Sequence, residues 1–365
     1  MALRIGLVGL PNAGKSTLFN ALTAARVDVG SYPFTTIEPN YGVAAVSDRR
    51  LERIFDIVRS ERSVPATVEF VDIAGLVKGS SQGEGLGNQF LGHIRNTDAL
   101  ALVLRCFEDS NVAHVSAQID PVADLGVLDL ELMLADLATV QRRIEKVRTQ
   151  AKARPKDYAE ELQFLQDLEA ELNRGKRALL SSLGDKEREW VLPLNLLTVK
   201  PRLLVANVGE SDLPEGNELA KAVCQVAENE GARCVVLCAR TEAELTEWPD
   251  EEAAAYRLEL GITEPGRDAL VRAGYELLNL ITFFTATGSK EVRAWPIPRG
   301  TTAGDAAGRI HSDIQRGFIR AEVVPFDVLD SLGSFAAVRE KGLLRLEGRE
   351  YVIQDGDIVH FRFNV

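Results

Sequence analysis

The chain has 365 residues, which is too long for one ordinary hydrophobic core and predicts two or three folding units. Its residues are 45% hydrophobic and 26% charged, as in ordinary globular proteins, and it has no apolar run of about 18 residues, which excludes a membrane-spanning protein. The net charge of −12 argues against a surface covered with nucleic-acid-binding side chains, but it permits a local basic patch.

The first 125 residues or so alternate apolar runs with helical stretches. This alternation is typical of an α/β unit with a mainly parallel sheet. The expected strands are the apolar runs Arg4–Leu10, Tyr41–Val46, Thr67–Asp72 and Ala99–Cys106, and the same pattern resumes at Arg202–Ala206 and Cys234–Leu237.

A phosphate-binding motif follows the first strand. The residues from Gly9 to Ser16 satisfy Gly-x4-Gly-Lys-Ser and lie between an apolar strand and a helical run, a context that disfavours a chance match. Its glycines let several backbone N–H groups face one anion at the positive end of a helix. We expect Lys15 to reach the β- and γ-phosphates and the Ser16 hydroxyl to ligate Mg²⁺. The residues predicted to bind the phosphates are Asn12, Ala13, Gly14, Lys15, Ser16 and Thr17.

Two further motifs complete the expected magnesium site. Asp72 ends a predicted strand and opens Asp-Ile-Ala-Gly, in register behind the phosphate loop. Asp72 can hold the metal through water, and the N–H of Gly75 can sense the γ-phosphate. Between the two motifs, Tyr-Pro-Phe-Thr-Thr offers a threonine for the Mg²⁺ shell, and spacing alone leaves Thr35 and Thr36 open.

A helical segment then interrupts the α/β pattern. Apolar residues recur at helical spacing from Leu128 to Arg154, Pro155 ends that helix, and a second helical stripe follows. We predict an inserted antiparallel hairpin at 127–198; the alternative is two ordinary surface helices. Its first helix and tip are basic and its second helix is acidic, so the basic residues either contact RNA phosphates or form a solvated face paired with the acidic helix. They are Arg142, Arg143, Lys146, Arg148, Lys152, Arg154 and Lys156.

A variant of the guanine-reading motif follows the strand at Arg202–Ala206. GTPases usually read guanine with Asn-Lys-x-Asp, whereas this chain has Asn207-Val208-Gly209-Glu210. Adenine lacks the N1–H that a carboxylate would accept, and an unpaired buried charge costs several kcal/mol, while Asn207 can pair with an N6/N7 edge. The motif favours ATP, with guanine accepted by Glu210 as the alternative. Cys238-Ala239 resembles the short motif that supports the base through backbone donors.

The last part of the chain has a different pattern. After a mostly helical connector, short strands, turns and one helix from Ile281 onward predict a separate small α+β domain. Gly356 marks a tight turn before the last strand. Basic residues among these strands are compatible with contact to RNA or the ribosome: Arg339, Lys341, Arg345, Arg349, His360 and Arg362.

The N-terminus and the cysteines favour the cytoplasm. The N-terminus lacks the basic stretch, apolar core and cleavage site of a signal peptide. The four cysteines are Cys106, Cys224, Cys234 and Cys238, with no Cys-x-x-Cys pair. Three lie in or beside apolar segments, so we expect small buried side chains in a reducing compartment.

Together these motifs resemble the YchF subfamily of Obg-related P-loop NTPases. The resemblance rests on Asn-Ala-Gly-Lys-Ser-Thr, Tyr-Pro-Phe-Thr-Thr, Asp-Ile-Ala-Gly-Leu, the stretch Gly83–Asn88 and Asn-Val-Gly-Glu, and it covers essentially the whole chain. It implies an OBG-type G domain at 1–126 and 199–280, an inserted coiled-coil hairpin at 127–198, and a β-grasp TGS domain at 281–365. It also implies a preference for ATP over GTP, Thr36 rather than Thr35 as metal ligand, and association with ribosomes, through the large subunit or the 70S particle.

The group that orients the attacking water is less evident. Many small GTPases use a glutamine just after Asp-x-x-Gly to orient the attacking water, but this chain has Leu76 there. Either hydrolysis is slow, or another group positions the water. His114, in a polar loop after a predicted strand, is the candidate that the resemblance favours, although an isolated histidine is usually a surface residue. With Lys15 and Gly75 it forms the predicted catalytic set. Asn12 either helps to hold a K⁺ ion against the phosphates, as in related enzymes, or only shapes the loop.

Two functions of different class follow from these residues. In the first, the chain is an ATPase whose switch loops gate docking on the ribosome. In the second, it is a housekeeping ATPase in which hydrolysis serves a small-molecule reaction. The second requires its own acid–base set, and the sequence offers none beyond the nucleotide motifs.

Overall fold

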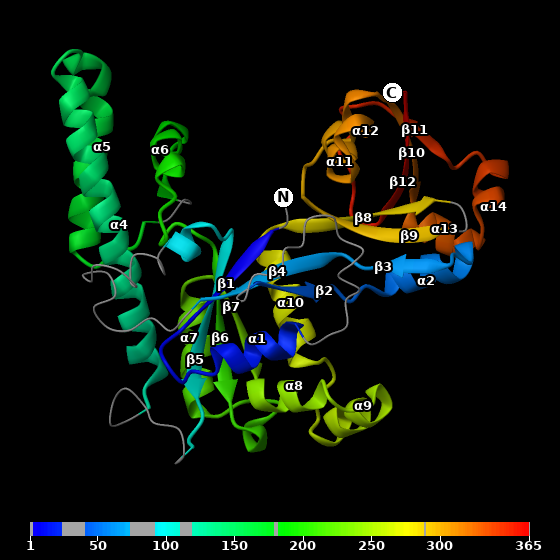
Figure 1. Ribbon diagram of the computed structural model, residues 1–365, viewed down its shortest axis with the longest axis horizontal. Coiled ribbons are helices and arrows are strands. Elements are labelled where there is room, and N and C mark those ends of the chain that lie inside the picture. The colour runs from blue at the N-terminus through cyan, green and yellow to red at the C-terminus, as the bar shows by residue number, and fades with distance from the viewer. Residues whose placement is uncertain are drawn as a thin grey trace. The chain divides into compact units, whose positions relative to one another are not determined.

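The computed structural model describes residues 3–23, 41–73, 92–109, 119–178, 182–287 and 290–364 (Figure 1). The chain divides into two compact units, one formed by Leu3–Gly42 and Glu69–Leu270 and the other by Val43–Val68 and Val271–Val365. Residues 43–68, which the sequence analysis placed in the G domain, group with the second unit by their contacts. The cause is strand β3 (Arg62–Val64), which pairs in parallel with a strand of the second unit.

The first unit is built on a six-stranded sheet in the order β2-β4-β1-β5-β6-β7. The pairings of β1 with β4 and β5, of β5 with β6, and of β6 with β7 are all parallel, which confirms the predicted sheet. The neighbouring interior strands β5 and β6 are buried along their whole length, as expected for parallel strands covered on both faces. The strands are β1 (Arg4–Val8), β2 (Tyr41–Ala45), β4 (Thr67–Asp72), β5 (Ala99–Cys106), β6 (Arg202–Val208) and β7 (Arg233–Leu237).

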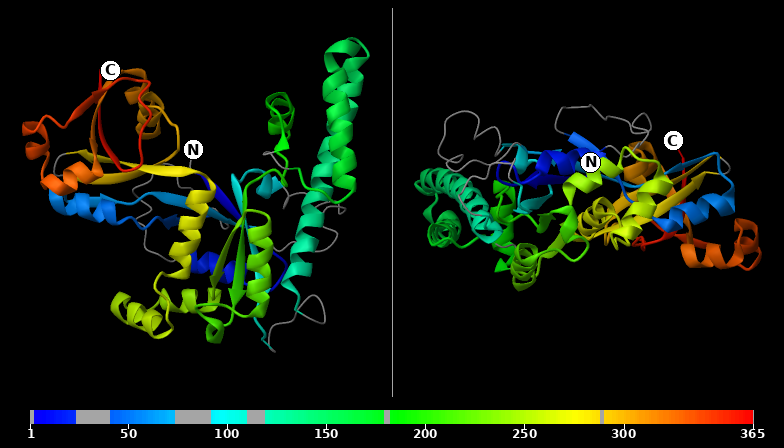
Figure 2. Two further views of the ribbon diagram at one scale, coloured as in Figure 1. Left: turned by 180° about the vertical axis from the view of Figure 1, so that it is seen from behind. Right: turned by 90° about the horizontal axis from the view of Figure 1, so that it is seen from below.

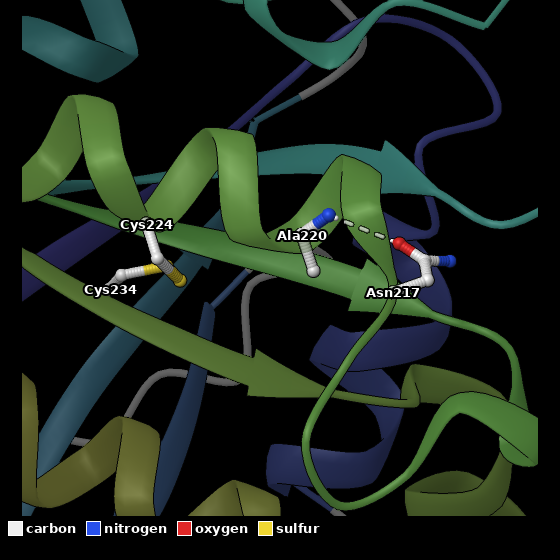
Figure 3. Close-up of a disulfide and its surroundings, with 4 residues drawn as sticks. All are labelled: Asn217, Ala220, Cys224 and Cys234. Carbon is white, nitrogen blue, oxygen red and sulfur yellow. Dashed lines mark hydrogen bonds between the residues drawn. A yellow bond between two sulfur atoms is a disulfide. The ribbon is translucent and has the colours of Figure 1, made fainter.

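Helices cover this sheet, and polar side chains cap α4 and α7 among them. Two of them, α4 and α7, share one hydrophobic core with the strands. The Asn217 side chain accepts a hydrogen bond from the Ala220 N–H at the start of α7 (Figure 3), which satisfies a backbone donor that the helix leaves unpaired. Besides the hairpin, the helices of this region are α1 (Lys15–Thr23), α6 (Asp185–Val191), α7 (Glu218–Asn229), α8 (Ala239–Leu245), α9 (Asp250–Glu259) and α10 (Gly266–Leu277), with 3₁₀ turns at Leu192–Leu194 and Glu210–Asp212.

The sequence predicted reduced, buried cysteines, and this prediction is wrong for two of them. Cys224 of α7 and Cys234 of β7 form a disulfide (Figure 3), with their Cα atoms 5.2 Å apart, whereas Cys106 and Cys238 are free and buried. The pattern of apolar segments could not reveal this pair, because it depends on α7 lying against the strand that follows it.

The predicted helical hairpin corresponds to α4 (Pro121–Ala151) and α5 (Pro155–Asn173), and α5 lies beside the C-terminal part of α4 (Figure 2). The first helix begins at Pro121 rather than near Leu128, because Asp120 caps it by accepting from two backbone N–H groups. Pro155 begins the second helix, a position where its missing N–H costs no hydrogen bond. The core between the helices includes Val140, Ile144, Val147, Leu165, Leu168 and Leu172.

The second unit contains a six-stranded mixed sheet in the order β11-β10-β12-β8-β9-β3. Neighbouring residues such as Phe283 and Phe284 belong to different hydrophobic clusters, so both faces of the sheet are covered. Its strands besides β3 are β8 (Leu280–Thr287), β9 (Glu291–Pro298), β10 (Phe318–Pro325), β11 (Arg345–Glu347) and β12 (Asp357–Phe363). Its helices are α2 (Arg49–Val58), α11 (Ala303–Ile310), α12 (Ser312–Arg316), α13 (Phe326–Leu332) and α14 (Phe335–Glu340).

The predicted α+β class of the C-terminal region is confirmed, but the predicted number of helices is wrong. One helix was expected, but the described residues after Ile281 contain α11, α12, α13 and α14. Gly356 has a φ of 88°, as the predicted turn before the last strand requires. Of the helices that the structure describes, none combines the length and the apolar character needed to cross a bilayer.

Candidate nucleotide-binding site

The loop between β1 and α1 depends on glycine at two positions. A Cβ added to Gly9 would lie 2.4 Å from the carbonyl oxygen of Val103. Gly14 has a φ of +92°, and a Cβ there would lie 2.2 Å from Nδ2 of Asn207. The loop therefore passes close to two strands on its way to the N-terminus of α1, where the backbone N–H groups and the helix dipole favour an anion.

Lys15 is the first residue of α1 and is buried, with 6% of its surface exposed. Its Nζ donates a hydrogen bond to the carbonyl oxygen of Leu10, 3.1 Å away. Burial lowers the pKa of Lys15, and the Asp72 carboxylate partly opposes that shift. An ammonium withdrawn from water in this way gains strongly from a phosphate placed beside it.

Ser16 and Asp72 come together as the motifs predicted. The Ser16 hydroxyl donates to Oδ2 of Asp72 at 2.9 Å. The other oxygen, Oδ1, is buried and has no hydrogen-bond partner among the residues that the structure describes. A hydroxyl and an unsatisfied carboxylate oxygen are hard ligands that suit Mg²⁺, so the residues present fit this ion.

Three of the predicted site residues lie outside the described residues: Thr36, Gly75 and His114. Their roles stay predictions. Asn12 is described and has a left-handed φ of 63°. Its K⁺ role is also a prediction, which equal hydrolysis rates in K⁺ and Na⁺ would contradict.

Asn207, at the C-terminal end of β6, joins three parts of the site. Its Nδ2 donates to the carbonyl oxygen of Ala13 in the phosphate loop, and its Oδ1 accepts from the N–H of Ala239, both at 2.9 Å. These two bonds leave one amide hydrogen and one lone pair of this side chain unused. The sequence predicted a base contact, and the structure adds that this side chain braces the phosphate loop against the start of α8.

Three other residues predicted near the base are described. Val208 ends β6 and is buried in the core. Cys238 is the N-cap residue of α8, and Ala239 is its first residue. Thr17, which was predicted to bind the phosphates, is exposed in the first turn of α1.

Glu210 has two partners that the sequence did not predict. Thr241 Oγ1 donates to Oε2 of Glu210 at 3.0 Å, and the Tyr256 hydroxyl donates to Oε1 at 3.1 Å. These donors lie 31 and 46 residues further along the chain, on α8 and α9. No local pattern connects them to the motif, so only the fold reveals the cluster.

Comparison with known proteins identifies the family. A model described as "50S ribosome-binding GTPase" matches residues 4–135, and one described as "Protein of unknown function (DUF933)" matches residues 280–364. The chain is 48% identical to the ribosome-binding ATPase YchF of Bacillus subtilis (strain 168), with 100% of each chain covered. The chain belongs to the YchF family. The YchF protein of Escherichia coli O157:H7 is 47% identical, again over 100% of each chain.

A solved structure of the YchF family supports the same assignment. The YchF GTPase of Schizosaccharomyces pombe matches with a TM-score of 0.87 at 33% identity, covering 99% of this chain and 97% of that chain. The resemblance inferred from the motifs is therefore confirmed, and so is the predicted P-loop fold class.

Proposed function

We propose that this YchF-family chain is a Mg²⁺-dependent ATPase that hydrolyses ATP, in preference to GTP, to ADP and phosphate. The observation that carries the proposal is the Ser16–Asp72 hydrogen bond beside the buried ammonium of Lys15, at the N-terminus of α1. A triphosphate at this place would meet backbone N–H groups, one ammonium and two oxygens suited to its metal ion. The relatives named above as ribosome-binding ATPases support the same activity.

The proposed roles follow from the positions of the side chains. Lys15 holds the β- and γ-phosphates, and Ser16, Asp72 and Thr36 hold Mg²⁺, which when bound neutralises charge on the phosphate oxygens. The N–H of Gly75 senses the γ-phosphate, and His114 orients the attacking water, since Leu76 cannot form a hydrogen bond. The base lies between Asn207, Val208, Glu210, Cys238 and Ala239.

Replacing Lys15 tests the activity directly. The variant Lys15→Ala is expected to bind ATP at least about tenfold more weakly and to lose turnover, because a charge-assisted contact to phosphate is removed. Competition of ATP and GTP against a labelled nucleotide, with phosphate release measured in parallel, gives both quantities. The control is Lys221→Ala, which removes an exposed lysine of α7. Full ATP affinity and turnover in the Lys15 variant would refute the proposal.

We also propose that ATP and ADP states of this chain dock differently on the ribosome, with RNA contacts from the hairpin and from the C-terminal TGS-like domain. Six of the seven basic residues of the hairpin are exposed. Among the described contacts, Arg143 pairs across the hairpin, its Nε donating to Glu161 at 2.8 Å. The alternative, a solvated face paired with the acidic helix, therefore accounts for Arg143. A cytoplasmic location is part of this proposal, because ribosomes are the proposed partner.

The hairpin is the better supported of the two contacts. In the C-terminal region, Arg362 pairs with Glu322 at 2.9 Å and Arg345 with Asp357 at 3.4 Å, so their charges are partly compensated within the domain. Partial burial and the nearby Arg362 lower the pKa of His360, which therefore carries little charge at neutral pH.

A further inference from the structure

The carboxylate of Glu210 is held by two hydroxyl groups, one on each of its oxygens. Thr241 approaches from α8 at 3.0 Å and Tyr256 from α9 at 3.1 Å. Thr241 is 3% exposed, so its hydroxyl has little access to water. The ring of Tyr256 lies 5.3 Å from that of Trp248, which helps to fix the direction of its hydroxyl.

The position of Glu210 makes these contacts relevant to the base. Glu210 follows the base-site residue Asn207 by three positions, where Asn-Lys-x-Asp proteins place the carboxylate that reads guanine. Guanine presents two donors to such a carboxylate, its N1–H and its 2-amino group, whereas adenine presents an N1 lone pair. A carboxylate without other donors would therefore attract guanine and repel adenine.

We propose that Thr241 and Tyr256 are specificity-determining residues: their hydroxyls hold the Glu210 carboxylate so that the site accepts adenine and does not read guanine. Each hydroxyl occupies a lone pair on a different oxygen and compensates part of the negative charge. Guanine would then meet a carboxylate whose orientation is fixed by these donors and whose charge is partly compensated. This inference rests on the proposed function, since it concerns the base of the nucleotide bound there.

The electrostatics of the cluster agree with this arrangement. The hydrogen bond to Glu210, followed by partial burial and by the charge of Glu210, raises the pKa of Tyr256 above its ordinary value. The phenol therefore remains protonated and able to donate at neutral pH.

The test removes both hydroxyls without changing the shape of the side chains. The ratio of the GTP Kd to the ATP Kd is measured by competition against a labelled nucleotide for the unaltered chain and for the double variant Thr241→Val, Tyr256→Phe. The ratio is expected to fall at least about tenfold in the double variant, because the freed carboxylate then accepts from guanine. Tyr256→Phe alone should lower it about threefold, and this variant keeps the test valid if the double variant does not fold. The control Thr246→Val removes a hydroxyl that donates to the Ala243 carbonyl oxygen on the same helix, and it should leave the ratio unchanged.

A third variant identifies the group that reads the base. Adding Glu210→Ala to the double variant should abolish the gain in GTP affinity. The inference is overturned if the ratio stays unchanged in the folded variants, if the unaltered chain binds ATP and GTP equally, or if the gain survives Glu210→Ala. An unaltered chain that binds no ATP would refute the proposed function itself, and this outcome differs from ATP binding with an unchanged ratio.

Discussion

Asp72 is the residue whose surroundings say most about the proposed metal site. One carboxylate oxygen accepts from Ser16, and the other is buried without a partner in the described part of the chain. Leaving a buried acceptor unsatisfied costs about 1–3 kcal/mol, more for a charged group. A cation bound at Oδ1 would offset this cost. The unsatisfied oxygen therefore destabilises the empty site and favours binding of Mg²⁺.

Replacing His114 tests the proposed positioning of the attacking water. His114→Ala is expected to lower the turnover of ATP at least about tenfold with nearly unchanged ATP affinity, because general acid–base or positioning groups contribute about that much or more to the chemical step. Single-turnover phosphate release and equilibrium ATP binding measure the two effects separately. His311→Ala, which removes a histidine that caps the short helix α12 of the second unit, is the control. Normal turnover in the His114 variant would remove this residue from the mechanism.

The sequence predicted the positions of those candidate residues that belong to a local motif. Lys15, Ser16 and Asp72 lie where the phosphate-loop and Asp-x-x-Gly patterns placed them, because each pattern fixes a turn at the end of a strand. Thr241 and Tyr256 were not predictable, since they reach Glu210 from helices far along the chain. Residues brought together only by tertiary packing leave no periodic signal.

At the level of elements, length decided which predictions succeeded. The strand Ala99–Cys106 was predicted with its observed bounds, because its first six residues form a clear apolar run and all eight are buried. Helices α12, α13 and α14 have five, seven and six residues, which is shorter than the window over which helical periodicity can be recognised. Strand β3 has three residues, two of them exposed, and it joins a sheet whose other strands lie more than 200 residues away.

Charge reversal at the hairpin tip tests the proposed RNA contact. Lys152→Glu with Lys156→Glu is expected to weaken ribosome binding at least about tenfold and to reduce its salt dependence, because fewer phosphate counterions are released. ATP turnover should stay unchanged. The matched control, Lys176→Glu with Lys221→Glu, changes the net charge equally at exposed lysines away from the tip. Co-sedimentation at several salt concentrations gives the affinities, and equal weakening in both variants would contradict a specific role for the hairpin.

At the level of the whole molecule, the chain passes between its two units at three points in the sequence, near residues 42, 68 and 270. The length of the chain predicted two or three folding units, and two compact units are observed. Residues 43–68 belong to the second unit, although the segments before and after them belong to the first. A segment of this kind links the residues around the phosphate motifs to the C-terminal unit through the covalent chain. The proposed switch needs such links, because a change at the γ-phosphate must alter surfaces that contact a large partner.

The nucleotide dependence of ribosome binding tests this switch for the molecule as a whole. Co-sedimentation with ribosomes should differ at least about fivefold between ADP and a non-hydrolysable ATP analogue, since a ligand shifts a conformational equilibrium only through its different affinity for the two states. The reciprocal effect is also expected: ribosomes should change the affinity for ATP relative to ADP by the same factor. Lys15→Ala should abolish the difference, whereas Lys221→Ala should retain it. If the chain co-sediments with ribosomes to the same extent in ADP and in the ATP analogue while ATP hydrolysis is intact, a housekeeping ATPase is favoured over a nucleotide-gated ribosomal factor.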